Sequence, residues 1–385
     1  MKIGIDARMY GPKQGGLGRY IEQLILHLEK LHTNVEFVIF LRRDNWNEYQ
    51  PSRPNFRKVL ADIPWYGLTE QIRLPVIIKK EKVDLMHFPH WNVPFFYSKP
   101  FVVTIHDLLL LHYPTRRAST LGPLLYWFKN CAFRIILNHA VKKAKHIFTV
   151  SEFSKQDIVR TLGVAEKKIA VTYPTPFENK KYKVENINYH NDTIPDTNYL
   201  LHDTFGITKP YVLYVGVAYP HKNLDGLLKA WKLFEEKYGT GYQLVLAGKK
   251  NYFYNRLTNN LTMKQFNNVI VTGFVPDADL PALYQGASLY IMPSFYEGFA
   301  LPALEAMAAG VPVASSNRTC LPEILQNSAL YFDPADAEGM ANAIFTGLTD
   351  TSARQKLLAA APAVLSLYQG EKLAQKTWEV YRNSV

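Results

Sequence analysis

The sequence contains few of the residues that stabilise secreted or metal-binding proteins. Only two of its 385 residues are cysteines, Cys131 and Cys320. They form no CxxC pair and have no histidine nearby at zinc-ligand spacing, which argues against a disulfide framework and a structural zinc site. We therefore expect two reduced thiols, as is usual inside the cell.

Long apolar segments are also missing. No apolar run approaches the roughly 18 residues that a membrane span needs. The N-terminal segment lacks the long apolar stretch of a signal peptide, because Asp6 interrupts it early. These absences predict a cytoplasmic protein, either free in solution or held at the inner face of the cytoplasmic membrane.

Two motifs of nucleotide chemistry are absent as well. No DxD pair, which would hold a metal against a diphosphate, stands directly at the end of a predicted strand. The GxGxxG turn that a dinucleotide-dependent oxidoreductase needs is not found either. We therefore expect no metal, no cofactor and no oxidoreductase activity.

The net charge of +11 is distributed unevenly. Residues 1–183 contain 29 Lys and Arg against 15 Asp and Glu, whereas residues 184–385 contain 15 against 18. The first part is thus at +14 and the second at −3. A basic first half favours a polyanionic partner, such as anionic lipid headgroups, a phosphate-linked acceptor or nucleic acid.

The chain length and the order of predicted elements indicate two domains. Residues 2–6 (KIGID) are typical of a buried strand, and a glycine-rich loop from Gly11 to Gly18 leads into a helix with apolar residues at helical spacing. Ser151 is a good N-cap for a helix over 152–162. Further strands are predicted at 35–41, 84–88, 101–105 and 146–150, and in a second cycle at 211–216, 242–247, 268–272, 288–292 and 312–315.

This alternation predicts an α/β fold with two doubly wound, Rossmann-like parallel sheets. Residues 176–205 are rich in Pro, Asn, Asp and Lys, and we interpret them as a linker with an insertion. The domains should therefore cover 1–175 and 206–370, followed by a last helix over 371–385. Ligands of such sheets bind at the carboxyl ends of the strands, which should line a shared cleft.

The strongest motif is SFYEGFALPALEAMAAG at 294–310, between a predicted strand and a helix. Pro302 suits the first turn of that helix, because its missing N–H is not needed there. Glu297 then lies in the loop, and Glu305 lies in the first turn or so. Free backbone N–H groups near 300–304 would form a phosphate site between the two carboxylates. A diphosphate that joins a sugar to a ribose needs this arrangement.

These two glutamates, separated by seven residues, resemble the hallmark of the family 4 (group 1) glycosyltransferases of the GT-B fold. The motif around residues 220–223 (PHKN) resembles the bacterial mannosyl- and rhamnosyltransferases of polysaccharide assembly. The resemblance implies two domains facing a central cleft. Residues 1–175 would bind the acceptor, with the helix 371–385 packing back on them, and residues 206–370 would bind a nucleotide-sugar donor.

The resemblance also implies roles for single residues on the donor side. Glu297 would contact the donor sugar, Glu305 the ribose and Lys222 a donor phosphate. The retained anomeric configuration is compatible with a route in which the leaving diphosphate takes the acceptor proton, without a dedicated base. The other residues assigned to the donor are Gly15, Gly16, His221, Gly273, Phe274, Gly298, Phe299, Ala300 and Leu301.

On the acceptor side, His106 follows the strand 101–105 and would lie beside the transferred sugar. His90 and Trp91 follow the strand 84–88, where they either shape the acceptor site or form a packed aromatic turn. Asp107 is assigned to the acceptor with them. Arg19 is assigned to the acceptor side too, where it is either a phosphate contact or a surface charge of the helix.

We therefore expect a metal-independent, retaining hexosyltransferase with no nucleic-acid partner. Our substrate hypothesis is mannose from GDP-mannose, transferred to a glycan or lipid-linked glycan in cell-surface polysaccharide synthesis. Residues 115–145 mix aromatic residues with seven Lys and Arg, and either lie on an anionic membrane or form a buried helix with a basic edge. Val217 stands where many relatives have arginine, and Ala300 where they often have glycine. Both departures support the alternative of a non-catalytic scaffold in an assembly complex.

Overall fold

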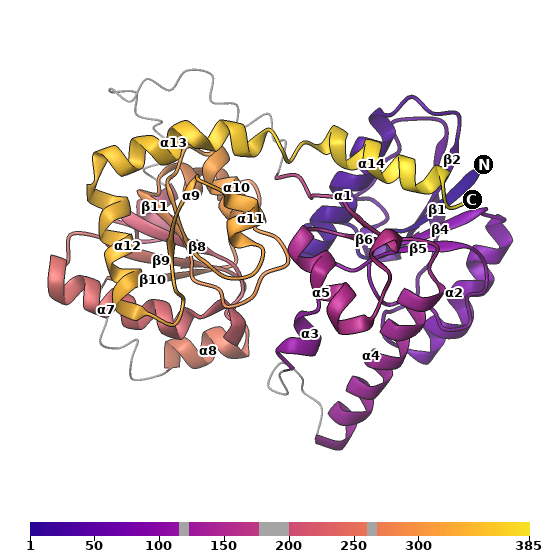
Figure 1. The fold of residues 1–385 in the computed structure, drawn as a ribbon, viewed down its shortest axis with the longest axis horizontal. Helices are drawn as coiled ribbons and strands as arrows, with labels where there is room; N and C mark the ends of the chain where they lie inside the picture. The colour runs from indigo at the N-terminus through magenta and orange to yellow at the C-terminus, as the bar shows by residue number, and fades with distance from the viewer. Residues whose placement is uncertain (115–122, 177–199, 260–267) are drawn as a thin grey trace. The chain divides into compact units, whose positions relative to one another are not determined.

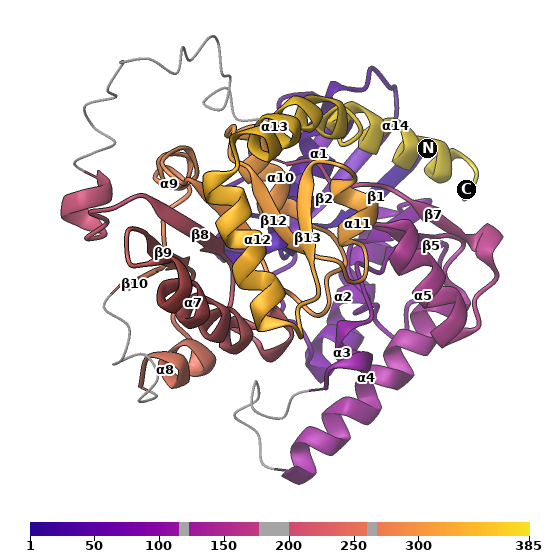
Figure 2. The same cartoon turned by 60° about the vertical axis from the view of Figure 1, so that its left-hand side comes forward.

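The computed structural model describes residues 1–114, 123–176, 200–259 and 268–385 (Figure 1). The chain forms two compact units, one of residues 1–175 with 368–385 and one of residues 176–367. Each unit contains a parallel sheet with helices on both faces (Figures 1 and 2). The expected α/β fold with two doubly wound parallel sheets is confirmed, and Cys131 and Cys320 are free thiols.

Within the described residues, the first unit contains a seven-stranded sheet. Its strands are β1 (Lys2–Asp6), β2 (Glu36–Leu41), β3 (Phe56–Leu60), β4 (Leu85–Phe88), β5 (Phe101–Thr104), β6 (Ile147–Thr149) and β7 (Ile169–Val171). Its helices are α1 (Gly15–Lys30), α2 (Leu68–Glu81), α3 (Leu109–His112), α4 (Pro123–Lys143), α5 (Glu152–Leu162) and α14 (Gly370–Arg382). The strand order is β3-β2-β1-β4-β5-β6-β7, so the direction of winding reverses between β1 and β4.

Both faces of this sheet are buried, because successive side chains of a strand point to opposite sides. On β2, Phe37 and Ile39 pack with α1 and α14, whereas Val38 and Phe40 pack with α2 and α4. The sequence analysis missed β3 and β7. The first contains the charged pair Arg57 and Lys58, and the second has only three residues.

The C-terminal helix α14 is fixed to the first sheet by a buried hydrogen-bond chain. His87 on β4 is 2.6 Å from the Tyr381 hydroxyl through Nδ1, and 2.8 Å from the Thr104 hydroxyl through Nε2. Burial, with a smaller contribution from His106, lowers the pKa of His87 to about 3. The imidazole is therefore neutral near pH 7, with one donor and one acceptor nitrogen, and both nitrogens meet a hydroxyl.

The second unit contains a six-stranded sheet within the described residues. Its strands are β8 (Tyr211–Val215), β9 (Gln243–Ala247), β10 (Val269–Gly273), β11 (Leu289–Met292), β12 (Val313–Ser316) and β13 (Ala329–Phe332). Its helices are α7 (Leu224–Tyr238), α8 (Tyr252–Asn259), α9 (Leu280–Gln285), α10 (Leu301–Ala308), α11 (Leu321–Leu325), α12 (Ala337–Thr349) and α13 (Thr351–Leu365). The strand order is β10-β9-β8-β11-β12-β13, and α7 and α12 pack on one face around Trp231 and Ile344.

Part of the predicted linker, Leu200–Thr204, forms one π-helical turn, and residues 177–199 lie outside the described residues. None of the helices in the described ranges has both the length and the apolar character that crossing a membrane requires.

We expect Tyr381→Phe to destabilise the first unit by about 1–3 kcal/mol, because a buried imidazole nitrogen loses its partner. Five of the six tryptophans lie in that unit, so the midpoint of urea unfolding followed by tryptophan fluorescence measures the effect. The exposed Tyr252 provides a matched control, and Tyr252→Phe should change the midpoint little. Equal midpoints for the two variants would show that the hydrogen bond does not hold α14.

Candidate active site

Two charged residues predicted for the donor, Lys222 and Glu297, meet beside the point where the second sheet reverses its winding. Lys222 follows β8 and Glu297 follows β11, and these two strands are neighbours at the reversal. Lys222 Nζ lies 2.7 Å from both carboxylate oxygens of Glu297, and the Ser294 hydroxyl donates to Oε1 at 2.7 Å. The Glu297 side chain is buried, so this charge is compensated within the protein rather than by water.

Asn223 holds the turn that carries Lys222. Its backbone is left-handed (φ 59°), a conformation that asparagine tolerates better than most residues. Its Nδ2 donates to the carbonyl oxygens of Pro293 at 3.1 Å and Pro334 at 2.7 Å. The turn after β8 is thereby fixed to the end of β11. On the Glu297 side of the ion pair, the backbone N–H of Glu297 donates to the Thr319 hydroxyl at 3.1 Å.

Glu305 is the fifth residue of α10 and is buried. Its Oε2 accepts a hydrogen bond of 2.8 Å from the hydroxyl of Tyr284, a buried residue of α9. This bond orients the carboxylate. Sequence reasoning missed Tyr284, Ser294 and Thr319, because nothing in the local pattern shows that these side chains reach the glutamates. It also missed the role of Asn223 in holding the turn.

The start of α10 offers fewer free N–H groups than the sequence predicted. The N–H groups of Ala303 and Leu304 both donate to the Ala300 carbonyl at 3.1 Å, and Pro302 has no N–H. The expectation of free donors at 303 and 304 is therefore wrong, because the first turn of the helix closes on its own cap. The donors that a phosphate could use at this helix start are those of Ala300 and Leu301.

Ala300 does not disturb this turn. It is fully buried and has an ordinary φ of −123°, so no glycine is required by the backbone, and its methyl group is not exposed at the surface. Gly298 is buried next to it, and Phe299 and Leu301 are half-buried.

His221 cannot replace the charge of the arginine that stands at Val217 in relatives. Burial, followed by the Lys222 charge, lowers the pKa of His221 to about 3, so the ring is neutral near pH 7. It stacks on Tyr219 with ring centroids 5.8 Å apart. Lys222 therefore provides the positive charge in this turn.

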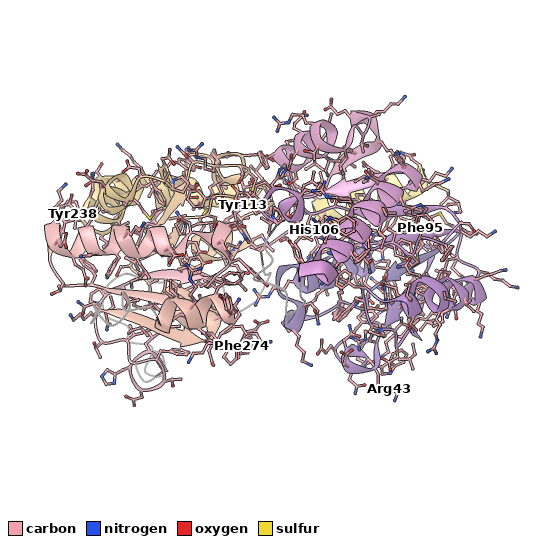
Figure 3. All side chains as sticks on the ribbon, turned by 90° about the horizontal axis from the view of Figure 1, so that it is seen from below. Arg43, Phe95, His106, Tyr113, Tyr238 and Phe274 are labelled. Carbon is pink, nitrogen blue, oxygen red and sulfur yellow. The ribbon has the colours of Figure 1, made fainter. Side chains whose placement is uncertain are left out.

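Gly273 and Phe274, which are assigned to the donor, lie at the end of β10. Gly273 has φ +78°, which favours glycine, and its carbonyl accepts a hydrogen bond from the Gly248 N–H. The next residue, Phe274, is 66% exposed, and Figure 3 labels it at the surface of the second unit.

A second polar group lies at the reversal point of the first sheet, and the sequence analysis did not anticipate it. Arg8, two residues after β1, is almost fully buried. It donates to the Asp6 carboxylate at 2.8 and 2.7 Å and to Glu70 Oε1 of α2 at 2.6 Å. Burial alone would lower the pKa of Arg8, but the two carboxylates raise it, so the guanidinium stays charged.

Asp6 and Arg8 line a small pocket between the ends of β1 and β4, together with Trp65, His90 and Asn92. Asn92 donates to Glu70 Oε2 at 2.7 Å. Three buried polar atoms that face no partner within the described residues belong to these side chains, namely Trp65 Nε1, His90 Nδ1 and Asn92 Oδ1. Buried polar atoms normally have a hydrogen-bond partner, so this pocket suits a ligand rich in hydroxyl groups.

His106 contacts the wall of the same pocket. Its Nε2 lies 3.0 Å from the carbonyl oxygen of Pro89, a pocket residue, and its ring is edge-on to Tyr20 at 4.7 Å. Burial lowers the pKa of His106 to about 4, although the bond to Pro89 opposes this. Because a carbonyl only accepts, Nε2 carries the proton and Nδ1 is left as an acceptor for a hydroxyl.

The remaining acceptor-side residues are placed differently. Trp91 packs in an aromatic group with Tyr66 (centroids 5.4 Å apart) and Phe133 (4.6 Å), and it does not line the pocket. Asp107 Oδ1 accepts from the N–H of Leu109, the first residue of the short helix α3, at 2.9 Å. Arg19 is half-buried on α1. The acceptor roles of all three stay predictions.

The glycine loop of the first unit is shorter than predicted, because α1 already begins at Gly15 (φ +62°). Gly18 lies inside the helix, where a Cβ would come within 2.0 Å of the Gly11 carbonyl oxygen, so only glycine fits. Gly15 and Gly16 are exposed and have open space around them. Packing therefore does not require glycine at these two positions, and their predicted donor role remains open to test.

Two family descriptions match most of the chain. Residues 14–175 match "Glycosyltransferase Family 4", and residues 203–364 match "Glycosyl transferases group 1". The chain belongs to glycosyltransferase family 4. This membership confirms the expected enzyme class, a retaining hexosyltransferase. The first matched segment carries Trp65, His90 and Asn92 of the pocket, and the second carries the Lys222–Glu297 pair.

Similar proteins extend the comparison over the full length of this family 4 chain. The O-antigen chain mannosyltransferase B of Escherichia coli is 28% identical, over 95% of this chain and 96% of that protein. Sucrose-phosphate synthase of Thermosynechococcus elongatus has a TM-score of 0.76 at 20% identity, covering 100% of this chain and 98% of that one. HepE of Anabaena, in complex with UDP-glucose, has a TM-score of 0.72 at 18% identity, covering 99% of each chain. The shared GT-B fold confirms the expected fold class.

Acid should destabilise the first unit more strongly than the second. Where a histidine has a lower pKa in the folded protein than in the unfolded protein, the unfolded protein binds more protons. The free energy of unfolding therefore falls as the pH drops below about 6.5, the usual pKa of histidine. His87, His90 and His106 lie in the first unit, and His221 lies in the second. Between pH 6.5 and about 4, each of these histidines should lower the free energy of unfolding by about 1.4 kcal/mol per pH unit.

Urea unfolding at a series of pH values, followed by tryptophan fluorescence, measures this slope for the first unit. His90→Gln should reduce the slope, because this residue then binds no proton on unfolding. An unchanged slope in the variant would show that His90 is not held neutral in the folded protein.

Proposed function

We propose that this family 4 glycosyltransferase transfers a hexose, in the first instance mannose from GDP-mannose, to a glycan or lipid-linked glycan acceptor in cell-surface polysaccharide synthesis. The similarity to an O-antigen mannosyltransferase over nearly the full chain supports this choice of sugar and pathway. The proposal puts transfer in the cytoplasm, at the inner face of the cytoplasmic membrane when the acceptor is lipid-linked.

The observation that carries the proposed donor site is the buried pair of Lys222 and Glu297, with Glu305 close in sequence on α10. The Lys222 ammonium group has three N–H donors. Two of them bond the carboxylate oxygens of Glu297. The third would contact an oxygen of the diphosphate. This charge stabilises the leaving group most as the sugar–phosphate bond breaks.

The two glutamates would then fix the ends of the donor. Glu297 Oε1 already accepts from both Lys222 and Ser294, whereas Oε2 accepts only from Lys222. Oε2 therefore has a further lone pair and would accept a hydrogen bond from a sugar hydroxyl while the ion pair persists. Glu305, oriented by Tyr284, would accept from the ribose hydroxyls. The N–H groups of Ala300 and Leu301 would donate to the phosphate between them.

For the chemical step we propose a front-face route with retention. The bond between the anomeric carbon and the diphosphate oxygen breaks, the acceptor oxygen bonds to that carbon on the same face, and the leaving oxygen takes the acceptor proton. The protein positions the reactants and stabilises charge. No dedicated base is used, and the metal independence of transfer stays a prediction.

The pocket of the first unit is our candidate for the acceptor. Trp65 Nε1 would donate to an acceptor hydroxyl, and His90 Nδ1 and Asn92 Oδ1 would accept from others. His106, with Nδ1 as an acceptor, would lie beside the transferred sugar. The charged group of Asp6, Arg8 and Glu70 keeps this wall rigid through four hydrogen bonds.

The donor site is tested by thermal unfolding with GDP, UDP, ADP and dTDP. A ligand at about 100 times its dissociation constant adds about 2.7 kcal/mol of stability. We expect one nucleotide to raise the melting temperature most, in EDTA as well, and the sugars of that base to be turned over. GDP with GDP-mannose is the expected pair.

Lys222→Ala and Glu305→Ala should reduce this shift, and Tyr284→Phe should reduce it less, because it removes only the bond that orients Glu305. Lys229→Ala, an exposed lysine of α7, is the matched control and should retain the full shift. If no nucleotide raises the melting temperature at millimolar concentration, the donor site is wrong and a non-catalytic scaffold is favoured.

The acceptor pocket is tested by Trp65→Phe, which removes one hydrogen-bond donor and keeps an aromatic ring. With methyl α-mannoside as the acceptor probe, KM should rise about fivefold or more, and nucleotide binding should not change. Trp46→Phe, in the same unit but outside the pocket, should leave KM unaffected. If Trp65→Phe and Trp46→Phe have the same KM for the acceptor, Trp65 does not contact the acceptor.

A further inference from the structure

The helix α2 exposes a line of apolar side chains. Leu68 is 83% exposed, and Ile72 and Val76 are each more than half exposed. Residues four apart share one face of a helix, so these three form a continuous line. Lys79 continues the line one turn later and is also exposed.

The helix α4 presents a second line of the same kind. Phe128 and Ile135 are more than half exposed and lie seven residues apart, which is close to two helical turns. His139 and Lys142 follow on the same face at the next two turns. As on α2, the line is apolar at its beginning and basic at its end.

A loop between β4 and β5 connects the two lines. The Phe95 N–H donates to Gln71 Oε1 of α2 at 2.6 Å, and the Phe95 ring lies 4.4 Å from the His139 ring of α4. Phe96, beside Phe95, is 69% exposed. Figures 1 and 2 show α2 and α4 close together in the first unit, and Figure 3 labels Phe95. We refer to the two lines together with Phe95 and Phe96 as the α2–α4 surface.

This surface has almost no negative charge. Residues 85–106 and 123–143 contain no Asp or Glu, and α2 contains only Glu70 and Glu81. Both are already paired, Glu70 with Arg8 and Glu81 with Arg57. The exposed cations of the two helices are Arg73, Lys79, Lys80, Lys129, Arg134, Lys142 and Lys143.

We propose that the α2–α4 surface docks the enzyme on an anionic lipid bilayer. Exposed apolar side chains in one continuous patch mark an interaction site. Their mixture with lysines and arginines that form no ion pair with the described residues fits the boundary between acyl chains and negative headgroups, where long basic side chains reach the phosphates. A neutral or basic protein partner would leave these cations uncompensated. Sequence reasoning pointed to residues 115–145, of which 115–122 lie outside the described residues, and gave no sign of α2 or Phe96.

The proposal is independent of the donor site and is tested by flotation of the full chain with lipid vesicles. We expect binding to phosphatidylcholine vesicles that contain phosphatidylglycerol, little binding to phosphatidylcholine alone, and weaker binding at high salt. Leu68→Ser with Ile72→Ser should lower the partition coefficient about tenfold or more, because two exposed apolar side chains are lost. Lys79→Gln with Lys142→Gln should lower it by a similar factor.

Matched controls lie on α7 of the second unit, where Leu233, Lys229 and Lys232 are also exposed. Leu233→Ser, and Lys229→Gln with Lys232→Gln, should float like the parent protein. The midpoint of urea unfolding, followed by tryptophan fluorescence, shows that each variant is folded. This control does not require nucleotide binding, so the test is separate from that of the proposed function. The proposal is overturned if phosphatidylglycerol does not increase flotation or if the α2 variant floats like the controls. It is also overturned if light scattering shows a dimer that Leu68→Ser with Ile72→Ser dissociates, since the surface then joins two copies of the chain.

Discussion

The ion pair between Lys222 and Glu297 joins the turns that follow β8 and β11, and the arrangement of the donor-side residues depends on it. A buried carboxylate is costly unless a cation and further donors compensate it, and here Lys222 and Ser294 do so. The pair fixes both turns in the absence of ligand. Asn223 and Thr319 hold the backbone on either side, so the charged groups are positioned before a donor arrives.

Both units place a buried charged group beside the reversal of the sheet, but they use different residues for it. Each sheet reverses its winding once, between β1 and β4 or between β8 and β11, and each has a buried charged group beside that point. In the first unit Arg8 is surrounded by Asp6 and Glu70, whereas in the second the cation is Lys222. The fork of an arginine bonds both carboxylates at once, while the single ammonium of lysine keeps one donor for a ligand. This difference is consistent with a rigid wall in one unit and a phosphate contact in the other.

Most strand positions along the chain could be predicted because both faces of these sheets are buried, which produces short apolar runs separated by helical periodicity. The runs at 2–6, 101–105 and 211–216 predicted β1, β5 and β8 to within one residue. Where that signal is weak the prediction failed, as for β3 with its charged residues. The early start of α1 was missed because glycines usually interrupt helices, whereas Gly18 is needed here for a close contact with Gly11.

The sequence by itself determined the two α/β sheets, the family and the candidate residues of the glutamate motif, because each was recognised from a pattern of residues close together in the sequence. The tertiary structure decided which side chains meet. Tyr284 reaches Glu305 across 21 positions, Arg8 reaches Glu70 across 62, and His87 reaches Tyr381 across 294. It also decided that Trp91 is packed among aromatic rings and that the line on α2 is exposed. Such contacts follow from how helices pack on a sheet, and no local pattern of residues records that packing.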